Sequence, residues 1–124
     1  MAREIETKCI HLEEEENSIN HYGAISYPIY QSATYAHPGV GQSTGYDYSR
    51  LQNPTREHLE KTVASLENGI DALAFSSGMA AITLMMELFK PGDHLIVDAD
   101  LYGGSIRLFN HVSEKNGIEF SSVD

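Results

Sequence analysis

The fold is decided by the stretch Phe75–Ile82, FSSGMAAI, in which two serines and a glycine join one apolar segment to another. The segment 71–75 before these small residues is mostly apolar, and the run 79–89 after them is almost wholly apolar. This pattern predicts a short strand, a tight turn and a buried helix. Such a turn gathers unpaired N–H groups and the positive end of the helix dipole at one point, where a phosphate can bind.

The turn also has a simpler interpretation. Ser77 can act only as the cap of the helix that follows, without any ligand. Gly78 would let a ligand approach the backbone closely, and Ser77 could add a hydroxyl donor. The stretch has neither the Gly-Lys-Ser/Thr of a Walker A loop nor the GxGxxG pattern. Taken alone, the turn is compatible with a capped helix and with a phosphate site.

A helix is expected before this turn, from residue 54 onward. Asn53 is suited to the N-cap, Pro54 to the first helical position and Gly69 to the stop, and Glu57 and Lys61 are spaced to form an ion pair. The apolar face of this helix is predicted to hold Leu59, Val63 and Leu66.

Helices and strands are expected to alternate along the rest of the chain. The predicted strands are 71–75, 94–99 and 118–124, and the further helices are 79–89 and 106–116. This order predicts an α/β fold with a largely parallel sheet that is buried on both faces. Because the last predicted strand reaches Asp124 without a closing helix, we expect the chain to be part of a longer protein.

Residues 1–53 show no sustained helical or strand period. Their aromatic residues include Tyr22, Tyr27, Tyr30, Tyr35, Tyr46 and Tyr48. Since such a segment has no core of its own, we expect it to pack on the domain that follows or on another subunit. We therefore divide the chain into an N-terminal arm, 1–53, and the start of an α/β domain, 54–124.

Composition excludes several classes of protein. The chain has 124 residues, 41% of them apolar, and a formal net charge of −10, which argues against binding to nucleic acids or anionic membranes. The acidic run Glu13–Glu16 is expected to be solvated or part of a mobile arm rather than an interaction tail. Cys9 has no disulfide partner, and the histidines have no metal-ligand spacing, so we predict no metal. No signal peptide or membrane-spanning run is present, which favours a cytoplasmic protein.

Two further segments carry residues suited to a phosphorylated, flat ligand. In YDYSRLQNPTR, 46–56, Tyr48 and Arg50 offer a phenol and a guanidinium fork, although they can also be a packed tyrosine and a surface arginine. In DLYGGSIRLF, 100–109, Tyr102 follows the end of a predicted strand, which is the edge where open α/β sheets bind ligands.

Together with FSSGMAAI, these blocks resemble the transsulfuration, or Cys/Met metabolism, family of pyridoxal 5′-phosphate enzymes. The resemblance extends from GAISYPIYQSATY, 23–35, to FSSVD, 120–124, in matching order and spacing. It implies the fold-type I, aspartate-aminotransferase-like architecture, with the arm on a neighbouring subunit and a truncated start of the mainly parallel-sheet cofactor domain. The backbone amides of Gly78 and Met79 would then bind the cofactor phosphate, with Ser77 beside them.

The resemblance also implies roles for the other two blocks. Tyr48 and Arg50 would reach the phosphate of the neighbouring subunit's cofactor. Tyr102 would stack on the pyridine ring and take part in substrate binding and proton handling, which makes it the one catalytic residue expected here. Family members are usually homotetramers built from two dimers, and their substrates are small molecules of the amino-acid class.

The family's Schiff-base lysine, pyridinium-pairing aspartate and carboxylate-binding arginine are implied to lie beyond Asp124, so we expect this chain alone to be inactive. Among the family's activities, we favour that of cystathionine γ-synthase, the replacement of the γ-substituent of an acylated homoserine by cysteine. YGGSIRLF resembles the synthases, and Gly104 stands where methionine γ-lyases typically have a cysteine. Cystathionine γ- or β-lyase, methionine γ-lyase and an inactive fragment remain alternatives. The acyl group and the preferred thiol stay open.

Overall fold

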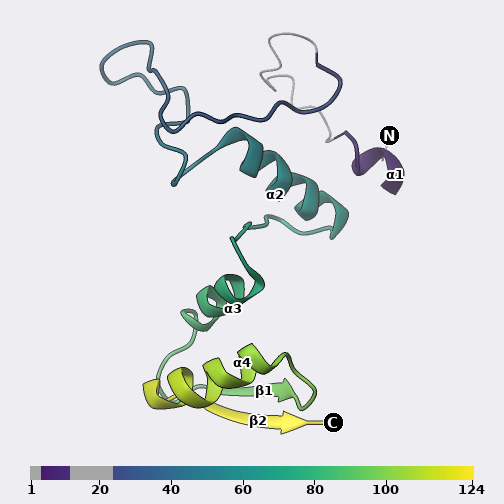
Figure 1. Cartoon of the computed structure of the whole chain (residues 1–124), viewed down its shortest axis with the longest axis vertical. Coiled ribbons are helices and arrows are strands. Elements are labelled where there is room, and N and C mark those ends of the chain that lie inside the picture. The colour runs from purple at the N-terminus through teal and green to yellow at the C-terminus, as the bar shows by residue number, and fades with distance from the viewer. Residues whose placement is uncertain (1–3, 12–23) are drawn as a thin grey trace. The chain divides into compact units, whose positions relative to one another are not determined.

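The computed structural model describes residues 4–11 and 24–124, which fall into two compact units, Met1–Ala74 and Phe75–Asp124 (Figure 1). The acidic run Glu13–Glu16, His21, Tyr22 and Gly23 lie outside the described residues. The boundary between the units differs from the division expected at residue 53, because the helix that follows the arm groups with it. The assignment of domains in the whole protein stays a prediction.

The first unit is organised around helix α2, Pro54–Leu66, with the short helix α1, Ile5–Lys8, beside it. The start of α2 follows the prediction: the Asn53 side chain accepts a hydrogen bond from the Thr55 amide at 2.8 Å, and Pro54 is the first helical residue. The expected ion pair is present, with 2.7 Å between Lys61 Nζ and Glu57 Oε1. α1 was not predicted.

The end and the apolar face of α2 differ from expectation. The helix ends at Leu66, and the left-handed residue beyond it is Asn68, with φ of 53°, rather than Gly69. Asparagine tolerates this conformation better than other residues with a side chain. Leu59 and Val63 are exposed, because little of the described chain covers the face that they share.

The arm packs on α2, as the tyrosine-rich composition predicts. Tyr27 stacks on His58 with 3.8 Å between the ring centroids, and the Tyr30 amide donates to Thr55 Oγ1 at 2.8 Å. Tyr46 donates a short hydrogen bond to Glu57. Antiparallel bridges at Thr34–Tyr48 and Gly39–Gln42 fold residues 34–48 into a loop. The described part of the arm therefore packs on the helix that follows it, while packing on another subunit stays a prediction.

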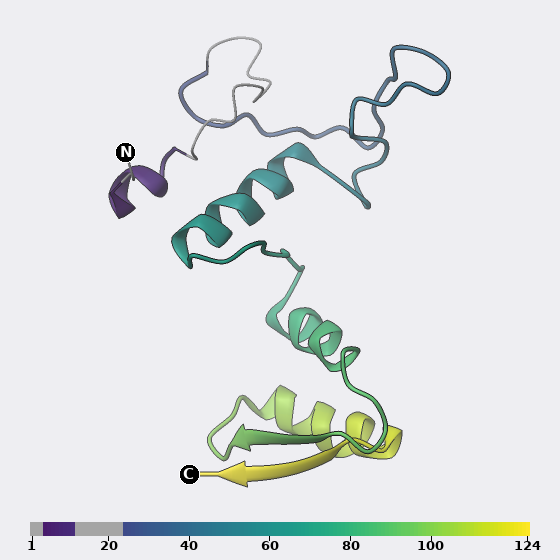
Figure 2. The same ribbon diagram turned by 180° about the vertical axis from the view of Figure 1, so that it is seen from behind.

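The second unit is a small α/β assembly. Its elements are α3, Gly78–Met86; β1, His94–Asp98; α4, Gly103–Leu108; the π-helical turn Phe109–Ser113; the 3₁₀ turn Glu114–Asn116; and β2, Glu119–Val123. The strands pair in parallel with His94 opposite Glu119, and α4 and the turns after it form the crossover between them (Figures 1 and 2). Met86, Phe109 and Ile118 form the buried core. The core lies on the face of the sheet that the crossover covers, where Phe109 stacks on Phe120 with 4.8 Å between centroids.

Three predictions about the chain after α2 are wrong in detail. Residues 71–75 form no strand, since a strand needs a hydrogen-bonded neighbour and the described sheet consists of β1 and β2 alone. The apolar run after the turn is helical only to Met86, and the next helix begins at Gly103. Burial on both sheet faces is not observed, because Ile96 and Val123 on the uncovered face are 68% and 52% exposed.

Within residues 4–11 and 24–124, no helix combines the length and the apolar character that crossing a bilayer requires.

Candidate functional site

The turn before α3 leaves two backbone amides free. Ser77 is extended, with φ of −159°, and its Oγ accepts a hydrogen bond from the Ala80 amide at 3.1 Å. The Ala81 amide donates to the Ser77 carbonyl at 3.2 Å. The amides of Gly78 and Met79 donate to no acceptor within the described residues. The helix cap and the phosphate site are thus compatible, because Ser77 satisfies one amide and leaves two others.

The space beside Gly78 is open. A Cβ built on Gly78 would meet nothing within 4 Å. A ligand can therefore approach the backbone at Gly78 closely, and the two free N–H groups and the positive end of the α3 dipole suit a phosphate in both charge and donor number. Gly78 does not have a positive φ, so its role here is the access that it gives to the backbone.

Tyr102 lies close to this turn, on the loop that joins β1 to α4. Its carbonyl accepts hydrogen bonds from the Ser105 and Ile106 amides at 2.8 and 3.3 Å, and its side chain is 72% exposed. Both its ring and Met79 Sδ lie within 3.0 Å of the point where Gly104 would carry a Cβ. The structure thus brings Tyr102 to Met79, one of the residues expected to bind the cofactor phosphate.

Tyr48 and Arg50 form a second pair in the first unit. The Arg50 guanidinium carbon lies 5.2 Å from the centroid of the Tyr48 ring, and both side chains are exposed. Within the described chain, Arg50 has no carboxylate partner at ion-pair distance. The guanidinium is therefore available to an anionic ligand, and the cation–π contact with Tyr48 orients it.

Arg56 holds the turn that carries Arg50, and the sequence prediction missed it. Arg56 Nη1 donates to the Ser49 carbonyl at 3.3 Å, and Nη2 donates to the Leu51 carbonyl at 2.5 Å. Its Nε lies 3.5 Å from Glu60 Oε1, one turn further along α2. The carbonyls on both sides of Arg50 are thus fixed by one guanidinium. The sequence feature that could have indicated this role is the position of Arg56 in the first turn of the helix that follows this loop.

The perturbed titrating groups of the first unit lie around α2. Hydrogen bonds from Lys61 and Tyr46 lower the pKa of Glu57, and burial raises the pKa of Tyr46 well above its ordinary range. Burial also lowers the pKa of His58, which favours its neutral form beneath the Tyr27 ring. These groups hold the arm to the helix and include none of the predicted site residues.

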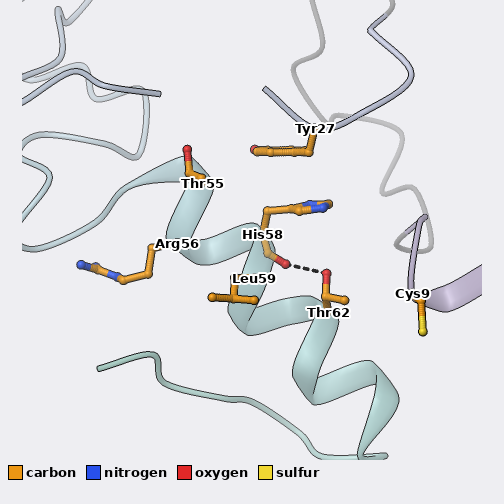
Figure 3. A pocket seen from close by; sticks show the side chains of 7 residues that line it. All are labelled: Cys9, Tyr27, Thr55, Arg56, His58, Leu59 and Thr62. Carbon is orange, nitrogen blue, oxygen red and sulfur yellow. Dashed lines mark hydrogen bonds between the residues drawn. The ribbon is translucent and has the colours of Figure 1, made fainter. Parts of the chain in front are cut away.

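A pocket of about 500 Å³ lies beside this packing (Figure 3). Tyr27 and His58 face one another on its wall, Cys9 lies at one side, and Thr62 Oγ1 donates to the His58 carbonyl at 2.8 Å. None of the residues predicted to bind the cofactor lines it. Within the described part of the chain, no three His, Cys, Asp or Glu side chains gather as a metal ion would require.

The chain matches, over residues 6–124, the family described as Cys/Met metabolism PLP-dependent enzyme. It is 50% identical over 124 residues to the Bacillus subtilis cystathionine gamma-synthase/O-acetylhomoserine (thiol)-lyase, covering 100% of this chain and 33% of that protein. It is 54% identical over 102 residues to the Bacillus subtilis cystathionine gamma-lyase, covering 82% of this chain and 27% of that protein. The chain thus spans about a third of the length of these relatives.

Solved structures of synthases and lyases also match the chain over nearly its full length. The crystal structure of metB from Corynebacterium glutamicum matches with a TM-score of 0.88 and 41% identity, covering 99% of this chain and 32% of that one. Cystathionine gamma synthase from Xanthomonas oryzae pv. oryzae, in complex with aminoacrylate and cysteine, matches with a TM-score of 0.87 and 35% identity over 100% of this chain and 32% of that one. These matches confirm the predicted fold-type I architecture. The chain belongs to the Cys/Met metabolism family of pyridoxal-phosphate-dependent enzymes.

Proposed function

We propose that this chain supplies the phosphate-binding and ring-stacking part of an enzyme that performs γ-replacement on an O-acylhomoserine. In this reaction the bond between the γ-carbon and the acyl oxygen breaks, and a bond from the γ-carbon to the sulfur of cysteine forms. The thiol proton is released and the acyl group leaves as a carboxylate. The observation that carries the proposal is the pair of free amides at Gly78 and Met79, which face open space close to Tyr102.

The residues of the turn would hold the cofactor phosphate. The Gly78 and Met79 amides can each donate one hydrogen bond to it, and the α3 dipole favours its negative charge. The Ser77 hydroxyl keeps its proton for a further hydrogen bond, because it uses only an acceptor lone pair to cap Ala80. When bound, pyridoxal phosphate supplies an electron sink for carbanions at the substrate's Cα and Cβ.

Tyr102 would cover the flat face of the cofactor and handle a proton. Its ring is exposed on the loop after β1, at the carboxyl edge of the parallel sheet. We assign to its phenol oxygen the transfer of a proton at the reacting carbons of the substrate. Covering by the ring would also exclude water from the site.

The arm would complete a neighbouring subunit's site. We propose that Tyr48 and Arg50 reach the phosphate of the cofactor in a second subunit, within a homotetramer built from two dimers in the cytoplasm. The exposed, unpaired guanidinium and the hold of Arg56 on its turn support this role. A guanidinium fork gives charge-assisted, two-pronged hydrogen bonds to phosphate.

Lyase activity is the second candidate. The chain is as similar to lyases as to synthases, with 47% identity to the Coxiella burnetii cystathionine beta-lyase beside the relatives above. In a lyase, the same carbanion chemistry would release a thiol from cystathionine instead of joining one. YGGSIRLF at 102–109 and Gly104 favour the synthase, and methionine biosynthesis is the pathway that we assign to it.

A direct assay separates these functions. The purified complete protein is supplied with pyridoxal phosphate and either O-acetyl- or O-succinylhomoserine plus cysteine, or with cystathionine alone. Cystathionine formed from the first mixture supports the synthase, whereas a 2-oxo acid formed from cystathionine supports a lyase. Absence of both products, with no absorbance from bound cofactor, would support the inactive fragment.

A further inference from the structure

The Tyr102 ring rests on the backbone of α4 at a residue that has no side chain. A Cβ built on Gly104 would lie 2.5 Å from Cε1 and 3.0 Å from Cδ1 of the Tyr102 ring. Carbon atoms that are not bonded to each other settle at about 3.5 to 4 Å. A side chain on residue 104 would therefore overlap the ring where it now lies, so the ring would have to shift.

Met79 approaches the same point from α3. Its Sδ lies 3.0 Å from the position of the missing Cβ, and Ser105 Oγ donates a hydrogen bond to this sulfur at 3.9 Å. Ser105 is only 4% exposed, so it fixes the sulfur from the interior side. The Tyr102 ring and the Met79 sulfur thus meet above Gly104, in the kind of contact that sulfur and aromatic rings favour.

We propose that Gly104 is a positioning residue for Tyr102. Its missing Cβ lets the ring lie beside Met79, whose amide belongs to the open turn, and so sets where the ring and its phenol stand relative to a bound cofactor. A side chain at 104 would displace the ring rather than unfold the unit, because Tyr102 is 72% exposed and has free space to move into. The consequence for the cofactor rests on the proposed function, whereas the placement of the ring does not.

The backbone at this position accepts alanine. Gly104 lies inside α4 and does not have a positive φ, and alanine favours a helix more than glycine does. Gly103, the residue before it, provides a matched control, because a Cβ there would meet nothing within 4 Å. Gly104→Ala and Gly103→Ala thus add the same methyl group to the same helix, and only the first displaces the ring.

The first test follows the Met79 methyl group by NMR. The complete protein, without cofactor, is labelled with ¹³C-methyl methionine, the Met79 signal is assigned with Met79→Leu, and Tyr102→Leu gives its position without the ring. We expect Gly104→Ala to move the signal toward that position and Gly103→Ala to leave it in place. An unmoved signal in Gly104→Ala, or an equal movement in Gly103→Ala, overturns the proposal.

The second test measures the cofactor. Pyridoxal phosphate is titrated into each apoprotein and the dissociation constant is read from its absorbance. Because aromatic stacking contributes about 0.5–1.5 kcal/mol, a displaced ring should raise the constant about two- to tenfold in Gly104→Ala and leave it unchanged in Gly103→Ala. Equal constants, with the methyl signal moved, refute the link to the cofactor. If the unmodified protein binds no pyridoxal phosphate, the proposed function fails, while the methyl signal still decides the role of Gly104.

Discussion

Replacement of Arg50 should weaken cofactor binding far more than it weakens the fold. The contact that the structure gives to its exposed side chain is with the Tyr48 ring at 5.2 Å, and such an exposed cation–π pair contributes about 0.5–1 kcal/mol. A charge-assisted hydrogen bond to phosphate contributes about 1.5–3 kcal/mol. Arg50→Ala should therefore raise the dissociation constant of pyridoxal phosphate about ten- to a hundredfold.

The assay uses the complete protein and two variants. Pyridoxal phosphate is titrated into the apoproteins of Arg50→Ala and Arg50→Lys, and their thermal unfolding is recorded without cofactor. The lysine variant keeps the charge and loses the fork, so its affinity should fall between those of the other two proteins. The unfolding temperatures should stay close together, because the loss of the exposed cation–π contact lowers stability by only about 0.5–1 kcal/mol. An unchanged affinity in Arg50→Ala would remove Arg50 from the phosphate site.

Hybrid dimers show which subunit the arm serves. A chain with Arg50→Ala is combined with a chain in which the family's cofactor-binding lysine is replaced. If the arm acts across the interface, one site in each hybrid has a normal lysine and a normal arm, and activity returns. The other site carries both defects. Should verified hybrids gain no activity over their parents, while Arg50→Ala alone is impaired, the arm serves its own subunit and our reasoning is refuted.

Three further predictions concern the turn, the arm and the acid stability of the first unit. Gly78→Val should lower pyridoxal phosphate affinity with little effect on unfolding temperature, because its side chain meets no protein atom, and Gly103→Val should lower neither; equal affinities would return the turn to a plain helix cap. Arg56→Gln should reduce cofactor affinity in the same direction as Arg50→Ala, since the Arg50 turn loses its guanidinium clamp, and a titration that finds normal affinity contradicts this. Hydrogen bonds from Lys61 and Tyr46 lower the pKa of Glu57 in the folded state. The ionised Glu57 therefore stabilises the first unit fully above the pKa of the unfolded chain, and this stabilisation is lost as pH falls through the lower pKa of the folded state. Hydrogen exchange of the amides in residues 27–35, corrected for intrinsic rates, should therefore speed up with falling pH less in Glu57→Gln than in the unmodified protein. An equal dependence on pH in the two proteins would exclude this role of Glu57.

Local signals predicted the elements that depend on neighbouring residues. The Asn53 cap, the first helical position of Pro54 and the serine cap of α3 all follow from hydrogen bonds within a few residues. The open turn at Gly78 was predicted for the same reason, because a strand-like segment followed by a capped helix leaves free amides wherever it occurs. The alternation of helices and strands likewise predicted the parallel pairing of β1 and β2.

Features that depend on distant residues were missed or wrong. The end of α2 depends on which residue takes the left-handed conformation, and the sequence offered both Asn68 and Gly69. The segment 71–75 has the composition of a strand, but pairing requires a neighbour that composition does not reveal. The place of Gly104 beside the Tyr102 ring and the Met79 sulfur was not predicted, since the pattern YGGS also suits a flexible turn.

Residues on the uncovered face of the sheet can report whether further protein covers that face. Ile96 points away from the core and is 68% exposed, so within residues 4–11 and 24–124 a polar replacement removes only the smaller, buried part of its surface. Where additional chain or another subunit buries this side chain, the same replacement would lower the free energy of unfolding by about 1.5–3 kcal/mol. The loss of stability caused by Ile96→Thr, measured in a shorter or longer version of the protein, therefore reports how completely the sheet is covered in that version, and it needs no activity assay.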